Sequence, residues 1–220
     1  MNEEPSVEAA WARITAWLRT HAPATAASLH PPAPARERAL AEERTGVLWP
    51  EQLRTWFSLH DRWDRDAGAA VLPGWPGPMS LTRALDDRQL RLKIEQDVTA
   101  DDEDAAEHRA EVAQQEAGQI AGAFLPAFIA LDENQSGDAL FVDCRRGPRH
   151  GCVTEWIDEA FDGAGPVWWS IAQMLSDVAD HLEQQTPCRY WRPQVEDGAV
   201  RWELDDLWDS TSRCLARAEQ

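Results

Sequence analysis

The residues best suited to chemistry lie in one acidic, glycine-containing loop that runs from Asp132 to Asp143. Counted from Asp132, oxygen-bearing side chains occupy positions 1, 3, 5 and 7, glycine occupies position 6 and a carboxylate occupies position 12, a spacing similar to that of calcium-binding loops. A β-turn in which Asp132 or Asn134 accepts hydrogen bonds from nearby amides accounts for the same residues. We expect a structural turn. The alternative is a calcium site or a metal-assisted enzyme centre built on Asp132, Asp138 and Asp143.

Other candidate catalytic residues lack the context that their chemistry requires. Ser136, Ser170 and Cys144 are not part of a nucleophile motif, and no glycine-rich phosphate loop occurs. The four cysteines are widely spaced, which predicts buried or idle thiols rather than zinc ligands or disulfides. His60 lies at the edge of an apolar helical face, where a structural histidine is common, and His150 lies in a loop. We therefore expect no enzyme activity and no cofactor or metal.

The composition is strongly acidic, with a formal net charge of −18 from 39 acidic and 21 basic residues. Nucleic-acid binding requires basic groups that neutralise phosphates, so this charge argues against a nucleic-acid partner. No apolar run is long enough to span a membrane, and the acidic start lacks the segments of a signal peptide, which predicts a cytoplasmic protein. The surplus negative charge fits either a solvated surface or attraction to a basic protein partner.

Two acidic stretches are the candidate partner-binding surface. The first is a polar helix expected over residues 101–118, with Ala106, Ala110 and Ala113 as a thin packing face. The second follows an apolar helix that begins near Pro50 and includes His60. The residues that we predict to contact a partner are Asp101, Asp102, Glu103, Asp104, Asp61 and Asp64. A solvated surface without a partner is the alternative for both stretches.

A β-meander is expected to position the loop from Asp132 to Asp143. Three short apolar runs between Phe124 and Trp156 are separated by turn residues, which is typical of antiparallel strands. Gly137 supplies the positive φ that the first turn needs. The Asp-Gly pair at 197–198 predicts a second, separate hairpin over residues 190–202.

Amphipathic spacing predicts helices around this meander. They are expected over residues 9–19, 36–45, 50–60, 81–92, 101–118, 170–182 and 204–215. Between them we expect an extended proline-rich linker over 21–34, a short strand at 71–72 and a turn over 162–166. The aromatic residues predicted to form the core are Trp56, Phe57, Phe128, Trp156 and Trp169.

The order of these features resembles the SUKH superfamily, which includes the Smi/Knr cell-wall-assembly regulators and many bacterial immunity proteins. The resemblance rests on Pro126 near the start of an apolar strand, Asp132-x4-Gly-Asp, a strand that ends in Asp143, and Gly-x-Val-x-x-Trp ending at Trp156. The order of apolar residues that ends in Trp56-Phe57 is also similar. The glycine that usually follows this helix in the family is missing here.

The resemblance implies an α+β fold with a mixed or antiparallel sheet, in which a central β-meander is covered by helices. Residues 1–35 would be an added N-terminal helix and proline-rich linker, and residues 36–220 the SUKH-like domain. It further implies a non-catalytic protein-binding domain. Such a protein would be an immunity protein that neutralises a toxin, with a basic toxin domain as its partner, or a regulatory interaction module.

Overall fold

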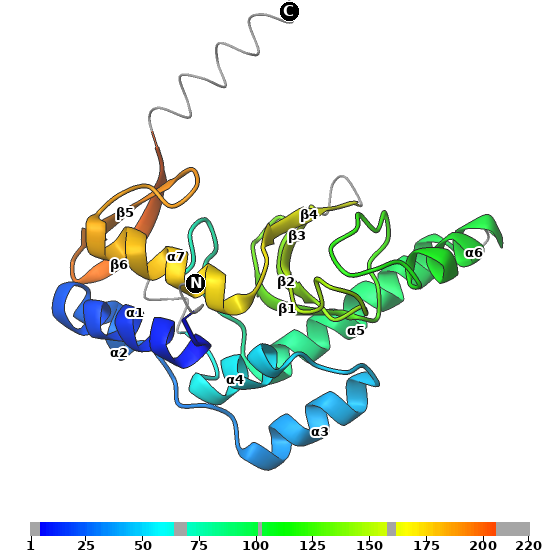
Figure 1. The fold of residues 1–220 in the computed structure, drawn as a ribbon, viewed down its shortest axis with the longest axis horizontal. Helices are drawn as coiled ribbons and strands as arrows, with labels where there is room; N and C mark the ends of the chain where they lie inside the picture. Colours follow the sequence, from blue (N-terminus) through cyan, green and yellow to red (C-terminus); the bar gives the residue numbers. More distant parts are fainter. Residues whose placement is uncertain (1–4, 64–69, 101–102, 158–161, 206–220) are drawn as a thin grey trace, which may run out of the picture.

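The computed structural model describes residues 5–63, 70–100, 103–157 and 162–205 of the 220-residue chain. The helices in these residues are α1 (Val7–His21), α2 (Pro23–Ala27), α3 (Ala35–Thr45), α4 (Glu51–Leu59), α5 (Leu81–Val98), α6 (Glu103–Val112) and α7 (Ile171–Gln184). The strands are β1 (Phe128–Glu133), β2 (Ala139–Asp143), β3 (Val153–Ile157), β4 (Asp162–Trp168), β5 (Trp191–Glu196) and β6 (Ala199–Leu204). The fold is α+β, as the sequence predicts (Figure 1). Within the described ranges, no helix has both the length and the apolar character needed to cross a bilayer.

The central sheet is an antiparallel meander with strand order β1-β2-β3-β4, and β5 and β6 form a separate hairpin. Its first three strands are the three apolar runs of the sequence. Both faces of the sheet are buried, because Ile129 and Val142 belong to one hydrophobic core while Phe128 and Phe141 belong to another. All residues of β1 and β2 are therefore buried, and the strands have continuous apolar runs instead of alternating ones.

The larger core lies between the sheet and the helices α1, α4 and α7. Trp11, Ile14 and Leu18 of α1 are buried in it together with apolar side chains of α7. At the edge of this contact Arg13 donates hydrogen bonds to Asp180 and Glu183 of α7. The helix predicted within residues 1–35 thus shares one core with the C-terminal half of the chain.

The smaller core covers the opposite face of the sheet and is aromatic. Phe124 packs edge-on against Phe128 and Trp156, each with a centroid separation of 5.6 Å. Such edge-to-face pairs stabilise a core beyond the apolar area that they bury. The residues that cover this face belong to the chain segment after α6, which includes Ala121 and Leu125. The last residue of α6, Val112, is buried in the same core.

The hairpin and the helix caps form as their local sequences predict. Asp197 and Gly198 have φ values of 50° and 76°, as a tight turn with two left-handed residues requires. The hydroxyl of Ser170 accepts a hydrogen bond from the amide of Gln173 and caps α7. Gly46 ends α3 with a φ of 67°. The helix predicted over 204–215 lies outside the described residues except for Leu204, which ends β6 instead, and Asp205, which belongs to no helix or strand.

The predicted turn over residues 162–166 is wrong, because this segment is the edge strand β4. Glycine and proline usually interrupt strands, but β4 has only one neighbour and its pairing with β3 shifts register twice. Pro166 pairs with Thr154 at the outer edge of the sheet, where a residue without an amide hydrogen is tolerated. Tertiary pairing with β3 therefore overrides the local turn preference.

Two further elements differ from the sequence prediction. The proline-rich stretch predicted to be extended contains the short helix α2, with Pro23 in its first turn. Residues 71–72 are not a strand. Val71 and Leu72 are fully buried in a loop, where the carbonyl of Val71 accepts a hydrogen bond from the indole of Trp202.

The aromatic prediction is confirmed for four of its five residues. Trp56, Phe57, Phe128 and Trp156 are buried, whereas Trp169 is 55% exposed. The guanidinium of Arg149 lies 4.4 Å from the centroid of this exposed ring. The predicted alanine packing face of α6 is also wrong, because its three alanines are exposed and Val112 is buried instead.

Candidate functional site

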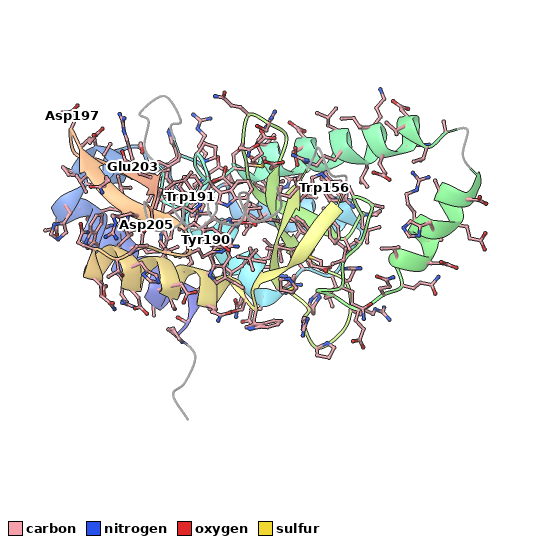
Figure 2. The ribbon with its side chains drawn as sticks, turned by 90° about the horizontal axis from the view of Figure 1, so that it is seen from above. Trp156, Tyr190, Trp191, Asp197, Glu203 and Asp205 are labelled. Atoms are coloured by element: carbon pink, nitrogen blue, oxygen red, sulfur yellow. The ribbon has the colours of Figure 1, made fainter. Side chains whose placement is uncertain are left out.

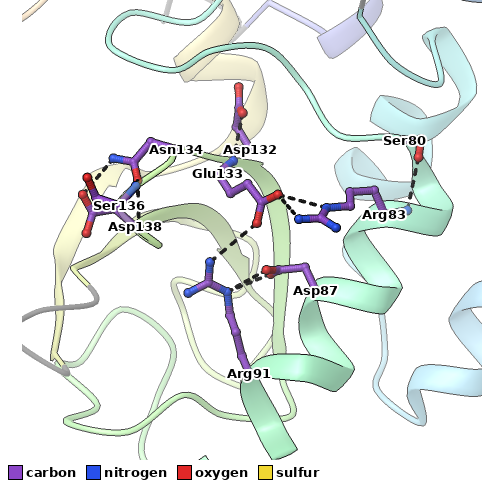
Figure 3. A network of polar contacts seen from close by, with 9 residues as sticks. All are labelled: Ser80, Arg83, Asp87, Arg91, Asp132, Glu133, Asn134, Ser136 and Asp138. Carbon is purple, nitrogen blue, oxygen red and sulfur yellow. Dashed lines mark hydrogen bonds and ion pairs between the residues drawn. The ribbon is translucent and has the colours of Figure 1, made fainter. Parts of the chain in front are cut away.

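Asp132, the first residue of the candidate metal loop, is fully buried and has a structural role. Its carboxylate accepts hydrogen bonds from the amides of Gly77, at 2.9 Å, and Glu133, at 2.8 Å. The first of these contacts connects the loop before α5 to the end of β1. Figure 3 shows the second, between Asp132 and Glu133. A buried carboxylate that is bonded to two amides keeps its polar atoms satisfied without an ion.

The turn between β1 and β2 is organised by Asn134. Its side-chain oxygen accepts hydrogen bonds from the amides of Ser136, at 2.9 Å, and Asp138, at 3.0 Å (Figure 3). Its amide group donates in turn to the carboxylate of Asp138, at 2.8 Å. Gly137 adopts a φ of 90°. This is the Asx-type turn that the sequence predicts.

Replacing Gly137 with valine is expected to destabilise the protein by about 1–3 kcal/mol, because a β-branched residue is strained at this positive φ. Ser136→Val, at the neighbouring exposed position without a positive φ, is the matched control and should change stability little. Calorimetry of both variants measures the difference. A rise in the melting temperature of the wild type on adding calcium would instead identify the loop as a metal site.

Asp143 lies at the opposite end of the β1–β2 hairpin from Asp132. In the strand register Asp143 pairs with Phe128, whereas Asp132 pairs with Leu140. The Asp143 carboxylate accepts hydrogen bonds from the amide of Gly118 and from the guanidinium of Arg145, both at 2.8 Å. The structure therefore does not bring Asp132 and Asp143 together around one ion. Within the described ranges, no three His, Cys, Asp or Glu residues form a group that could hold a metal.

A polar network joins α5 to the end of β1 (Figure 3). Arg83 donates to the carboxylate of Glu133 through two of its nitrogens. Arg91 donates to Asp87 one turn earlier on α5, at 2.8 Å, and its terminal nitrogen lies 3.9 Å from Glu133. Burial raises the pKa of Asp87, and the ion pair with Arg91 opposes that change. These alternating positive and negative side chains hold α5 against the sheet. Asp87 and Glu133 are each next to an arginine, so neither carboxylate is isolated.

The three cysteines that the structure describes are poorly reactive in this fold. Cys144, Cys152 and Cys188 are free and buried. Burial raises the pKa of all three thiols, to about 11 for Cys152 and about 12 for Cys188. Thiols of such high pKa are poor nucleophiles at neutral pH. The fourth cysteine, Cys214, lies outside the described residues.

The two predicted partner-binding residues whose side chains the structure describes, Asp61 and Asp104, do not lie on one surface. Asp104 is exposed near the start of α6. Asp61 is half-buried, and its carboxylate accepts a hydrogen bond from the amide of Leu81 at the first residue of α5. Because α5 has 18 residues, Asp61 and α6 lie at opposite ends of a helix about 27 Å long. Asp64, Asp101 and Asp102 lie outside the described residues, as does the side chain of Glu103.

The second half of α5 and α6 project from the body of the protein. In Figure 2, α6 lies at the far end of the molecule from the β5–β6 hairpin, whose turn carries Asp197. Arg109 of α6 holds the two helices together by donating to the carbonyl of Glu95 and the hydroxyl of Thr99. We call residues 90–112, without 101–102, the acidic arm.

The acidic arm combines carboxylates with an exposed apolar stripe. Asp104, Glu107 and Glu111 are exposed on α6, and their spacing of three and four residues places them on one helical face. The stripe lies on α5, where Leu90, Ile94 and Val98 are 54%, 46% and 67% exposed. These three residues are four apart and therefore also share a face. The stripe was not recognised in the sequence, although its spacing of four residues is the signal that would have revealed it.

No known family model matches this sequence, and no match was found among curated proteins. The SUKH resemblance and the function that it implies therefore stay predictions.

Proposed function

We propose that the protein is a non-catalytic protein-binding domain, either an immunity protein that neutralises a toxin or a regulatory module, as the SUKH resemblance implies. Its partner would be a basic protein, such as a toxin domain that acts on nucleic acid. The acidic arm would be the contact surface. The observation that carries this proposal is the exposure of three carboxylates on one face of α6, a helix in which Val112 is the one buried side chain among those that the structure describes.

The energetics of α6 support a role in binding. A helix of ten residues is marginal on its own, and α6 contributes little to either core. Glu107 and Glu111 are like charges one turn apart, which destabilises a helix by about 0.2–0.5 kcal/mol. Neither glutamate makes an ion pair with a described residue. A basic partner would relieve this repulsion on binding.

The apolar stripe on α5 supports a protein as the partner instead of a small cation. Leu90, Ile94 and Val98 together present an exposed apolar surface on α5, in the same arm as the carboxylates of α6, and exposed apolar patches mark protein-interaction sites. Burial of the stripe would provide affinity. The carboxylates of α6 would attract the partner from a distance and select against acidic competitors.

The non-catalytic part of the proposal is supported by the loop from Asp132 to Asp143. Its three buried carboxylates, Asp132, Glu133 and Asp143, are each bonded to backbone amides or to an arginine, so none of them is an isolated acid or base. The ring nitrogens of His60 bond to no described residue, and burial raises the pKa of the thiols of Cys144, Cys152 and Cys188. What these groups do is stabilise the sheet and its connections.

The test is the association rate with the product of a toxin gene adjacent to this one, measured across a series of salt concentrations. The variant Asp104→Asn, Glu107→Gln, Glu111→Gln is expected to associate roughly tenfold more slowly at low salt and to depend less on salt. Its fold should be unchanged because all three side chains are exposed.

The matched control removes the same charge elsewhere. Glu37, Glu43 and Glu203 are also exposed, and replacing all three with glutamine should leave the association rate nearly unchanged. Equal slowing in both variants would mean that total charge, and not the arm, attracts the partner. An association rate that responds to neither salt nor substitution would contradict the proposal.

A further inference from the structure

A cavity of about 810 Å³ opens where three segments that are distant in the sequence meet. Its walls are the connection between α3 and α4 (residues 46–48), the chain just after α6 (113–115) and the loop between β2 and β3 (144–150), with Ala127 before β1. The cavity belongs neither to the turn around Asn134 nor to the exposed faces of the acidic arm. Its volume lies within the range of small-molecule sites in proteins.

The charged lining of this cavity is basic, although acidic residues outnumber basic ones by 39 to 21 in the whole chain. Arg145, Arg146 and His150 line it, and no Asp or Glu among the described residues does so. Arg145 is already paired with Asp143. Arg146 is exposed and makes no ion pair with any described residue, so its guanidinium is available to an anion.

His150 is held in an orientation that leaves one ring nitrogen for a ligand. Its Nδ1 lies 2.9 Å from the carbonyl oxygen of Arg145. A carbonyl oxygen accepts hydrogen bonds and cannot donate them, so Nδ1 carries the hydrogen and donates. Nε2 makes no hydrogen bond to the described part of the chain. The histidine therefore adds a second polar group to the same wall as Arg146.

Apart from Gln114 and Gln115, the rest of the lining is apolar. Val47, Leu48, Ala113 and Ala127 contribute to it together with the buried thiol of Cys144. Leu48 is 71% exposed, a large exposure for a leucine next to a cavity. A mostly apolar lining with a small number of polar groups at fixed positions is typical of sites that bind organic ligands. A phosphate site would instead gather several cations or converging amides.

Close backbone contacts fix the walls before any ligand binds. A Cβ at Gly147 would lie 3.0 Å from the side chain of Glu116, and one at Gly151 would lie 3.0 Å from Pro50. Both glycines have positive φ, 124° and 94°. On the other wall, the amide of Ala117 donates to the carbonyl of Arg146 at 2.8 Å. The loop is thus held on both sides, and such a preformed site loses little entropy on binding.

We propose that this cavity binds a carboxylate carried on an apolar body, with Arg146 as its ion-pair partner and with His150 donating to the same carboxylate when Nε2 also carries a hydrogen. The apolar body would contact Val47, Leu48 and Ala113. The ligand is either a free organic acid or the C-terminal carboxylate of a polypeptide. The inference goes beyond the proposed function, because it uses different residues and holds whether or not the acidic arm binds a basic protein.

The test is a titration of the ¹⁵N-labelled protein followed by amide chemical shifts. The probes are hexanoate, its neutral analogue hexanamide, inorganic phosphate, and the tripeptide Gly-Gly-Leu with a free or an amidated C-terminus. We expect hexanoate to shift the amides of residues 46–48, 113–115 and 144–150, and hexanamide and phosphate to bind at least roughly tenfold more weakly. Tighter binding of the free tripeptide than of hexanoate would identify a polypeptide C-terminus as the ligand, and the reverse order a free acid.

Three variants test the assignment of residues. Arg146→Gln should weaken hexanoate binding roughly tenfold, and Arg146→Lys should retain most of it. Arg36→Gln removes the same charge from an exposed position on α3 and should have no effect. Ala113→Trp should narrow the cavity and weaken binding without unfolding the protein, because Ala113 is exposed. The proposal is overturned if hexanoate shifts none of these amides, if hexanamide binds equally well, or if Arg146→Gln binds hexanoate like the wild type.

Discussion

Lowering the pH from 7 to 4 is expected to reduce the free energy of unfolding by about 3 kcal/mol through one side chain, His60. This histidine is fully buried among three tryptophans. Its ring stacks on Trp11 at a centroid separation of 4.7 Å, meets Trp56 edge-on at 4.3 Å and lies 6.0 Å from Trp63. Neither ring nitrogen has a hydrogen-bond partner among the described residues. Burial accordingly lowers the pKa of His60 from 6.5 to about 3.

The direction of the effect follows from proton binding. Between pH 6.5 and 3 the unfolded chain binds a proton at His60 and the folded protein does not, so stability falls as the pH falls through this range. Above pH 6.5 the side chain is neutral in both states and contributes no pH dependence. A loss of this size is a large part of the 5–15 kcal/mol that typically stabilises a domain.

Denaturant unfolding at several pH values between 7 and 4 measures the effect. His60→Leu has a side chain that does not titrate, so the difference in unfolding free energy between wild type and variant should change by about 3 kcal/mol over this range. Replacing His108, which is exposed on α6, should leave the pH profile of the wild type nearly unchanged. Parallel profiles for wild type and His60→Leu would show that His60 is not the titrating group.

Elements whose cause is local could be predicted from the sequence. The turn around Asn134 and Gly137, the Asp-Gly hairpin and the Ser170 cap each form from hydrogen bonds or φ angles of neighbouring residues. The buried runs of β1 and β2 were recognisable because continuous apolar residues between turn signals have few other uses. His60 was expected to be structural, and its complete burial fits that expectation.

Elements whose cause is tertiary could not be predicted. The Gly- and Pro-rich segment of β4 is a strand because β3 pairs with it. Trp168 and Trp169 are adjacent and chemically identical, and their sequence does not say which ring points to the core. In the structure Trp168 is buried, with its indole bonded to Asp177, and Trp169 is exposed. Choosing between them requires the strand's orientation on the core.

The same distinction between local and tertiary causes applies to the candidate sites. The carboxylates of α6 were found because charge density is visible in a sequence. Asp61 was grouped with them for its charge alone, whereas its hydrogen bond to Leu81 places it at the far end of α5. The cavity beside Arg146 is assembled from segments that lie about 30 to 100 residues apart. No local pattern of residues in the sequence predicts such a site.

Replacing Arg145 with alanine is expected to destabilise the protein by about 3–5 kcal/mol, because it leaves the buried carboxylate of Asp143 without its charge partner. Both side chains are 2% exposed and lie 2.8 Å apart. The guanidinium also donates to the carbonyls of Val112, at 3.2 Å, and Gln119, at 2.5 Å. Arg145 therefore connects the end of β2 to the chain that follows α6.

The loss of stability in Arg145→Ala should be concentrated in one part of the fold. Without Arg145, the end of α6 and the segment up to Gln119 lose two of their attachments to the sheet, so amide exchange there should accelerate before global unfolding. Arg146→Ala is the matched control, since the neighbouring guanidinium is exposed and unpaired with described residues, and its effect should stay within about 0.5 kcal/mol. Both substitutions remove a guanidinium group at neighbouring positions. A difference between their effects on stability therefore reports the burial and the ion pairing of Arg145.

Denaturant unfolding of Arg145→Ala, Asp143→Ala and the double variant gives the coupling between the two side chains. Each single substitution leaves a buried charge unpaired, whereas the double substitution removes both charges. The double variant should therefore be less destabilised than the sum of the two single variants. Two results would contradict the role of this ion pair in holding α6 against the sheet. One is simple additivity of the two single effects, and the other is a loss of stability for Arg145→Ala as small as that for Arg146→Ala.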